Sequence, residues 1–128
     1  MNRILIAEDE TRLAAFLEKG LRQYGYETVV AEDGSQALAA VQAEDIKLLL
    51  LDLGLPVKDG WAVLEELRSE GRKIPVIVLT AIDDHKSRKV ALDAGAKEYM
   101  TKPFRFSDLL EKVQIYTQKD GDDEAKED

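Results

Sequence analysis

Four consecutive leucines followed by an aspartate, at positions 48–52, constrain the fold of this chain more than any other feature. An apolar run this short, followed by a loop with Gly and Pro, is typical of a strand that is buried on both faces. Ligands of open parallel sheets bind outside the carboxyl ends of the strands, so a strand that ends at Asp52 would present its carboxylate to a crevice. Asp52 could also be a helix N-cap or an ordinary surface residue.

Apolar runs that predict strands alternate with segments of helical periodicity along the whole chain. The predicted strands are 3–7, 27–31, 48–52, 75–80 and 98–100. Helices are predicted around 13–24, 37–41, 61–67, 90–94 and 106–113. Five strands alternating with five helices favour an α/β fold, with a parallel sheet covered on both faces. In a doubly wound, flavodoxin-like sheet, the strand order 2-1-3-4-5 places strands one and three at the topological switch point.

The length of 128 residues predicts one domain. We expect this domain to occupy residues 1–118, followed by an acidic disordered tail at 119–128 that is either a free terminus or the start of a linker. The tail carries six acidic residues and two lysines, and therefore half of the net charge of −8. Because the remaining part is only mildly acidic and shows no basic face, we expect no direct nucleic-acid binding.

The composition also narrows the location and the type of metal site. No apolar run approaches the length of a membrane span, and the N-terminus lacks the long apolar region of a secretory signal. We therefore expect a cytoplasmic protein without a membrane partner. The absence of cysteine excludes thiolate ligands and leaves oxygen atoms to bind any metal, which favours a hard cation such as Mg²⁺.

Charged or polar side chains that can take part in chemistry follow four of the predicted strands. They are Glu8 and Asp9, Asp52, Thr80, and Lys102. Carboxylates that converge repel one another and need a cation. Mg²⁺ accepts one or two carboxylates, such as Asp9 and Asp52, together with waters and phosphate oxygens. Lys102 would add a positive charge and Thr80 a hydroxyl donor. Together these groups would stabilise a phosphoryl group during its transfer to a carboxylate.

Each of these residues also has a simpler interpretation. The acidic run at 8–10 could favour the first helix electrostatically, Thr80 could be an ordinary strand residue, and Lys102 a solvated surface charge. Their joint placement after four separate strands favours the chemical interpretation. The single histidine, His85, is expected in the loop after the fourth strand, and we interpret it as a surface residue.

As a spaced set, these motifs resemble the receiver domains of two-component response regulators, from Arg3 to about Tyr116. Each motif is weak alone, but the set is highly specific. The matching motifs are Glu8-Asp9, Asp52, Pro56 and Asp59-Gly60 in the following loop, Thr80-Ala81, and Lys102-Pro103-Phe104.

The resemblance implies a role for each site residue. Asp52 would accept a phosphoryl group from a histidine kinase or a histidine phosphotransfer protein. Asp9, Asp52 and the backbone carbonyl of Gly54 would bind Mg²⁺, with Glu8 assisting through a water molecule. Lys102 would contact the phosphoryl group, and the peptide bond from Lys102 to Pro103 would be cis.

The resemblance also implies a conformational switch. The hydroxyl of Thr80, next to Ala81, would move to the phosphoryl group while the ring of Tyr99 turns inward. The surface of the fourth helix, fifth strand and fifth helix would then change toward a partner, an output domain or a second copy. Tyr99 could instead be a half-exposed strand aromatic. Such a chain is a phosphoacceptor and not an enzyme, although it assists its own phosphotransfer and dephosphorylation.

Two departures from the family pattern bear on output. The sequence looks like the winged-helix transcription-factor class of these regulators. However, Lys97-Glu98 stands where that class usually shows two acids, and Gln114 where a basic residue is common. These positions disfavour the usual charge-paired dimer of that class, and a homodimer through the surface of the fourth helix, fifth strand and fifth helix stays an alternative. The resemblance also implies that Gly54 and Ile82 border the path of the hydrolytic water. Neither side chain can hydrogen-bond that water, so we expect slow loss of the phosphoryl group.

Other functions are left open by the residues alone. Phosphatases of the haloacid-dehalogenase type also use an aspartate nucleophile with Mg²⁺. Those phosphatases carry an Asp-x-Asp motif after their first strand. Here the aspartate would follow the third strand, and Gly stands at position 54, where the motif has its second Asp. A pseudo-receiver that works without phosphorylation is disfavoured by the intact acidic set. A nucleotide-binding protein is disfavoured because no glycine-rich loop follows the first strand.

Overall fold

A computed structural model describes residues 2–125 of the chain. Strands and helices alternate along the described residues without exception. The strands are β1 (Arg3–Ala7), β2 (Glu27–Ala31), β3 (Leu48–Leu51), β4 (Val76–Thr80) and β5 (Glu98–Thr101). The helices are α1 (Thr11–Gln23), α2 (Gly34–Ala43), α3 (Gly60–Ser69), α4 (His85–Asp93) and α5 (Phe106–Ala125).

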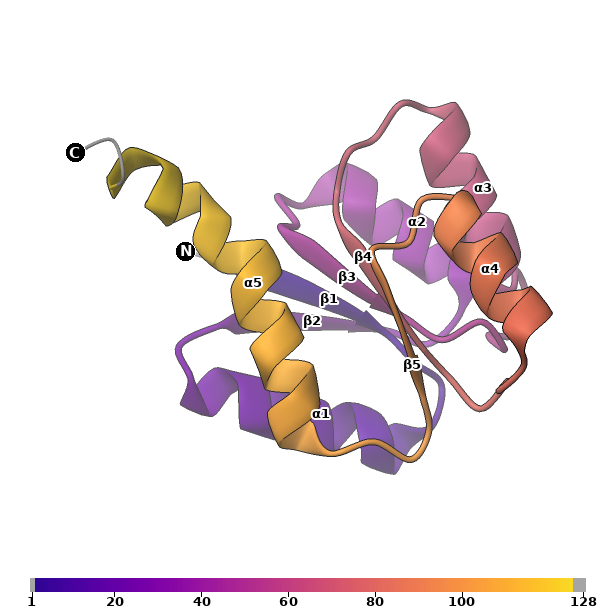
Figure 1. Cartoon of the computed structure of the whole chain (residues 1–128), viewed down its shortest axis with the longest axis horizontal. Coiled ribbons are helices and arrows are strands. Elements are labelled where there is room, and N and C mark those ends of the chain that lie inside the picture. Colours follow the sequence, from indigo (N-terminus) through magenta and orange to yellow (C-terminus); the bar gives the residue numbers. More distant parts are fainter. Residues whose placement is uncertain (1, 126–128) are drawn as a thin grey trace.

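The strands form one parallel sheet in the order β2-β1-β3-β4-β5, which confirms the predicted α/β fold and strand order. β3 lies at the centre, where Leu49 pairs with Leu5 of β1 on one side and with Val76 of β4 on the other. Helices α1 and α5 cover one face of the sheet, and α2, α3 and α4 cover the other (Figure 1). The carboxyl ends of β1 and β3 therefore lie side by side at the switch point.

The four leucines of β3 are buried on both faces of the sheet, as the sequence predicts. Leu48 and Leu50 belong to the core beneath α1 and α5, and Leu49 and Leu51 belong to the core beneath α2, α3 and α4. Full burial of one such side chain contributes about 1.5–3 kcal/mol. This strand is consequently well fixed, and so is the residue that follows it.

Three helices are preceded by an N-cap aspartate whose carboxylate accepts a backbone hydrogen bond. Asp33 accepts from the N–H of Gln36 at 2.8 Å, Asp59 from Ala62 at 2.9 Å, and Asp84 from Ser87 at 2.7 Å. The caps at Asp33 and Asp59 fix the first turns of the two helices that flank the loop after β3.

Some predicted boundaries differ from the observed ones. β3 ends at Leu51, so Asp52 is the first residue after the strand and not its last residue. Pro75 precedes β4 because proline has no N–H for the ladder, although its carbonyl accepts a hydrogen bond from Leu49 at 3.0 Å. His85 is exposed, as expected, but it begins α4 and does not lie in the preceding loop.

Helix α5 runs to Ala125 and so continues past position 118, where we expect the domain to end. The last three residues of the expected tail lie outside the described residues, and the division at 118 stays a prediction. None of the helices within residues 2–125 combines the length and the hydrophobicity that a membrane crossing requires.

Candidate functional site

The candidate site lies at the carboxyl edge of the sheet, where β1 and β3 end. Two backbone hydrogen bonds extend the sheet pairing one residue beyond these strands. The N–H of Glu8 donates to Ala31 O at 3.0 Å, and the N–H of Asp52 donates to Ala7 O at 3.1 Å. The backbone at both acidic positions is therefore held by the sheet itself.

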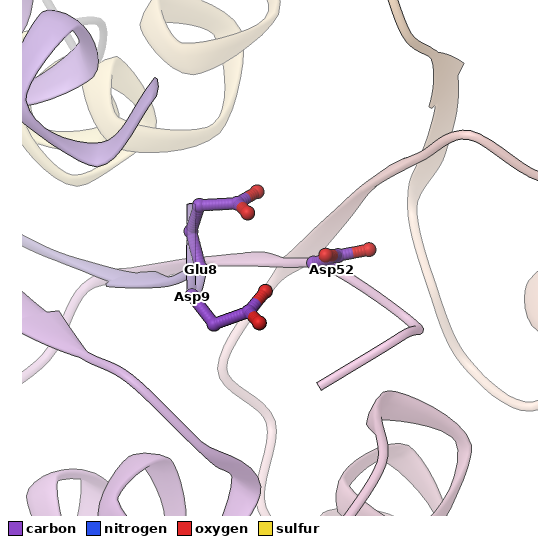
Figure 2. Close-up of side chains that lie close together, drawn as sticks. All are labelled: Glu8, Asp9 and Asp52. Atoms are coloured by element: carbon purple, nitrogen blue, oxygen red, sulfur yellow. The ribbon is translucent and has the colours of Figure 1, made fainter. Parts of the chain in front are cut away.

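The side chains of Glu8, Asp9 and Asp52 point into one region and form an acidic cluster (Figure 2). One carboxylate oxygen from each residue lies within 4.8 Å of the others. Glu8 and Asp52 are 2% and 8% exposed, whereas Asp9 is open to solvent. Three carboxylates at this spacing, one of them accessible from solvent, fit the oxygen ligands that Mg²⁺ prefers.

Lys102 supplies a positive charge to the acidic cluster. Its Nζ lies 2.9 Å from Glu8 Oε1 and 3.4 Å from Asp52 Oδ2. Burial raises the pKa of Glu8 above its ordinary value, and the hydrogen bond from Lys102 partly offsets this effect. Burial alone would lower the pKa of Lys102, but the hydrogen bond to Glu8 and the charge of Asp52 raise it. The peptide bond from Lys102 to Pro103 is cis, as the resemblance implies.

The backbone of Asp52 and Leu53 is closely covered by the start of α3. The N–H of Gly54 donates to Asp52 Oδ1 at 3.1 Å, which orients the carboxylate. The first turn of α3 lies directly on this segment, because a Cβ at Gly60 would be 2.5 Å from the carbonyl oxygen of Asp52. The N–H of Gly60 also donates to Leu53 O at 2.9 Å. Glycine at position 60 is thus required by close approach of two backbones.

The loop between β3 and α3 also packs against α2. A Cβ at Gly34, the first residue of α2, would overlap with the backbone carbonyl of Lys58. Val57, in the same loop and next to Lys58, has a φ of +67° and is 81% exposed. This left-handed conformation is unusual for a β-branched residue and indicates local strain.

Thr80 and Tyr99 both contact the backbone of Ile82 in the loop between β4 and α4. The buried hydroxyl of Thr80 accepts a hydrogen bond from the N–H of Ile82 at 3.3 Å. The phenol of Tyr99 donates to Ile82 O at 2.8 Å, and Tyr99 is only 5% exposed. The alternative of a half-exposed strand aromatic is therefore wrong for Tyr99. Ala81, between the two contacts, is exposed.

Two residues near the site have no role assigned from the sequence. Glu10 Oε2 lies 3.5 Å from Lys102 Nζ, and its place in the acidic run at 8–10 is the signal that could have identified it. The guanidinium of Arg88 lies 5.0 Å from the centroid of the Tyr99 ring. No spacing in the sequence indicates this contact, because it depends on how α4 packs on β5.

The family model for the response regulator receiver domain matches residues 4–114. The chain is 38% identical over 113 residues to the transcriptional regulatory protein PcoR of Escherichia coli, across 88% of this chain and 50% of that protein. It is 43% identical over 111 residues to the transcriptional activator protein IrlR of Burkholderia pseudomallei, across 87% of this chain and 48% of that protein. The chain therefore spans about half the length of the curated relatives it matches.

Solved structures of the same kind align with nearly the whole chain. The receiver domain of the Francisella response regulator 1452 aligns with a TM-score of 0.89 and 30% identity, across 93% of this chain and 98% of that one. The response regulator TrrA of Thermotoga maritima, in complex with Mg²⁺ and BeF, aligns with a TM-score of 0.81 and 34% identity, across 91% and 99%. From the family match and the fold together, we conclude that this chain belongs to the receiver domains of two-component response regulators, which are signalling domains.

Proposed function

We propose that Asp52 is the phosphoacceptor and that the phosphodonor is a histidine kinase or a histidine phosphotransfer protein in the cytoplasm. The observation that carries this proposal is the meeting of three carboxylates and one ammonium group at the end of β3. An Asp52 oxygen would attack the phosphorus and form a new P–O bond. The P–N bond of the phosphohistidine would break, and its electron pair would stay on the imidazole nitrogen.

Lys102 and Gly54 would support this step from opposite oxygens of the carboxylate. The Gly54 N–H holds Asp52 Oδ1, and Lys102 Nζ stands 3.4 Å from Oδ2. An ammonium group at this place would stabilise the charge on the oxygens of the incoming phosphoryl group. The N–H of Lys102 donates to Thr80 O of β4 at 2.8 Å, and Gly54 is oriented by its bond to Asp52, so little reorganisation would be needed during transfer.

The oxygen-rich donor set favours Mg²⁺ as the cofactor. Asp9, Asp52 and the backbone carbonyl of Gly54 are the proposed ligands, and Glu8 would assist through a water molecule. The bound ion would supply charge neutralisation between the carboxylates and the phosphoryl oxygens. The Mg²⁺ complex named for TrrA belongs to that protein and supports the assignment by analogy.

The proposed output is a change in the surface formed by α4, β5 and α5. Thr80 would turn from the Ile82 N–H to a phosphoryl oxygen, and the loop before α4 would follow. The receiving partner would be an output domain, as the double length of the relatives favours, or a second copy of the chain. Glu98 already binds the Tyr116 hydroxyl at 2.7 Å and Lys112 at 3.8 Å. This carboxylate is thus engaged within the chain, which disfavours the usual charge-paired dimer.

Intact-mass measurement tests the phosphoacceptor. Incubation with acetyl phosphate and Mg²⁺ should add one phosphoryl group to the wild type and none to Asp52→Asn. Omission of Mg²⁺ should abolish the labelling. Equal labelling of both proteins would contradict the assignment of Asp52. A protein that is labelled under no condition would instead favour the phosphorylation-independent binding module.

Magnesium titrations of two alanine variants test the proposed ligand roles, with the fluorescence of Trp61 at the start of α3 as the signal. Asp9→Ala removes a direct ligand and should weaken binding most. Glu8→Ala removes a group that acts through water and should weaken it by about tenfold. A larger loss in Glu8→Ala than in Asp9→Ala would show that the two roles are reversed.

A further inference from the structure

The ring of Tyr99 is restrained from two directions in the described structure. Its hydroxyl donates to Ile82 O, and the guanidinium of Arg88 lies 5.0 Å from the ring centroid. One nitrogen of the same guanidinium, Nη1, donates to the Tyr99 carbonyl at 3.3 Å. Burial raises the pKa of the Tyr99 phenol, and the charge of Arg88 acts against that rise. The ring is therefore buried as a neutral phenol beneath a cation.

Arg88 lies on a helix that two contacts attach to the rest of the chain. At the C-terminal end of α4, Nη1 of Arg68 donates to Asp93 O at 2.7 Å and so connects α3 to α4. Ala91 is completely buried against the core beneath α4. A planar guanidinium can contact an aromatic ring and donate a hydrogen bond at the same time, whereas an ammonium group makes a point contact. Arg88 thus has the position and the geometry to hold the ring.

Thr80 and Tyr99 are not in matching arrangements. The Thr80 hydroxyl is bonded to the N–H of Ile82 within its own loop. The Tyr99 ring, in contrast, already occupies the inward position that the proposed switch assigns to the signalling state. Both contacts involve the backbone of Ile82, at its N–H for Thr80 and at its carbonyl for Tyr99, and Tyr99 is inward while the Thr80 hydroxyl is still bonded within its loop.

We propose that Arg88 is the positioning residue that keeps Tyr99 inward before phosphorylation, so that the tyrosine half of the switch is already set. The meaning of this arrangement for signalling rests on the proposed function, but the restraint itself does not. Phosphorylation would then act mainly through Thr80 and the loop before α4. The surface around β5 would be available to a partner at a lower level of phosphorylation than a freely turning ring would permit.

Fluorine NMR of protein labelled with 3-fluorotyrosine measures the exposure of the ring directly, through the shift change between H₂O and D₂O. Tyr99→Phe assigns the signal, and the 56% exposed Tyr24 gives an exposed reference in the same sample. In the wild type without Mg²⁺, the shift change between H₂O and D₂O should be smaller for Tyr99 than for Tyr24. In Arg88→Met the ratio of outward to inward ring should rise about three- to fivefold.

Two matched variants separate positioning from general effects on α4. Lys89→Met removes a cation from the neighbouring position, which pairs with Asp93 at 3.3 Å, and should leave Tyr99 unchanged. Arg88→Lys keeps the charge but loses the planar donor, and it should fall between the wild type and Arg88→Met. Thermal unfolding of each variant confirms that the chain is folded at the temperature of the NMR measurement.

The proposal would be overturned if Arg88→Met gave the wild-type signal, or if Tyr99 of the wild type were as exposed as Tyr24. Addition of Mg²⁺ and beryllofluoride should leave the wild-type Tyr99 signal in its buried state. A change from exposed to buried at that point would also overturn it. Because the first measurements contain neither Mg²⁺ nor a phosphoryl analogue, they decide on Arg88 even if Asp52 proves not to be the phosphoacceptor.

Discussion

The acidic site and the region around Tyr99 are held in place by different kinds of contact. Near Asp52, backbone packs on backbone, with Gly60 against the Asp52 carbonyl and Gly34 against the Lys58 carbonyl. Near Tyr99, long side chains connect the elements, namely Arg88 to the ring and Arg68 to the end of α4. The acidic site is thus held by glycines that let two backbones approach closely, and the region around Tyr99 is held by arginine side chains.

This difference matches what each region has to do. Chemistry at a carboxylate requires oxygen atoms at fixed distances, and close backbone packing leaves few alternative arrangements. A signalling surface needs at least two arrangements of similar free energy. Contacts made by exposed arginines can be exchanged for contacts with water at a cost of about 1 kcal/mol or less, so they favour one arrangement of this surface without making it permanent.

The largest effect should come from adding one methyl group at Gly34. In Gly34→Ala the new Cβ would overlap with the Lys58 carbonyl, and the loop after β3 would have to move. We expect a loss of about 3 kcal/mol in the free energy of unfolding, measured by urea denaturation. Gly54→Ala is the matched control, because its Cβ would lie 3.9 Å from the nearest atom, Asp52 Oδ1. Similar stability of the two variants would contradict the idea of a backbone-packed site.

Most of the acidic site could be predicted from the sequence because it depends on the ends of strands. The apolar run at 48–51 identifies a strand buried on both faces, and the alternation of elements gives a parallel sheet. In such a sheet the carboxyl ends of neighbouring strands meet. Glu8, Asp9 and Asp52 follow the neighbouring strands β1 and β3, so the topology that local patterns determine brings them together. Lys102 follows β5, two strands from β3, and its long side chain reaches the cluster.

The remaining features depend on tertiary packing and carry no local signal. The contact of Arg88 with Tyr99 joins residues on two elements, and any exposed helix position occupied by arginine would look the same in the sequence. The positive φ of Val57 falls where no glycine or asparagine marks a left-handed residue. The continuation of α5 to Ala125 is a separate case, because it runs through an acidic segment whose composition predicts disorder.

A smaller effect, and of opposite sign, is expected at Val57. Holding a non-glycine residue in the left-handed region costs about 1–3 kcal/mol, whereas glycine loses about 0.5–1 kcal/mol more entropy on folding. Val57→Gly should therefore stabilise the chain by about 1 kcal/mol in the same urea measurement. Val57→Ala keeps a Cβ and should recover less. Destabilisation by Val57→Gly would show that the loop is not strained and that its rigidity has another source.

In the region around Tyr99, the contribution of Tyr116 to the free energy of unfolding should depend on pH. Burial and the hydrogen bond to Glu98 raise the pKa of Tyr116 to about 12. The folded state favours the neutral phenol of Tyr116. The stability that this phenol contributes is therefore present below the ordinary pKa of about 10 and is lost as the pH rises toward 12. Tyr116→Phe should cost at most about 1 kcal/mol at neutral pH, and the cost should shrink above pH of about 10. Tyr24→Phe is the exposed control. A cost that stays constant with pH would exclude the hydrogen bond as its origin.

The smallest expected effect concerns one residue from each region, Gly54 of the acidic site and Ile82 of the loop before α4. Hydrolysis of a phosphoaspartate requires a water in line behind the phosphorus. Glycine has no side chain to orient that water, and the Ile82 side chain, packed against the core, can exclude it without hydrogen-bonding it. The opposing effect is the open space at Gly54, where a Cβ would meet only Asp52 Oδ1, at 3.9 Å. A loosely held water could enter there, so the predicted slowing is moderate.

Polar side chains at both positions should therefore shorten the lifetime of the phosphorylated state. We expect Gly54→Asn/Ile82→Glu to lose its phosphoryl group about three times faster than the wild type, which corresponds to ~0.7 kcal/mol of the barrier. The decay is followed by intact mass in Mg²⁺ buffer after removal of acetyl phosphate. Gln114→Glu adds the same charge on α5 and should decay at the wild-type rate. If the double variant decays no faster, water orientation at these positions does not set the lifetime, and access through the open space beside Gly54 becomes the better explanation.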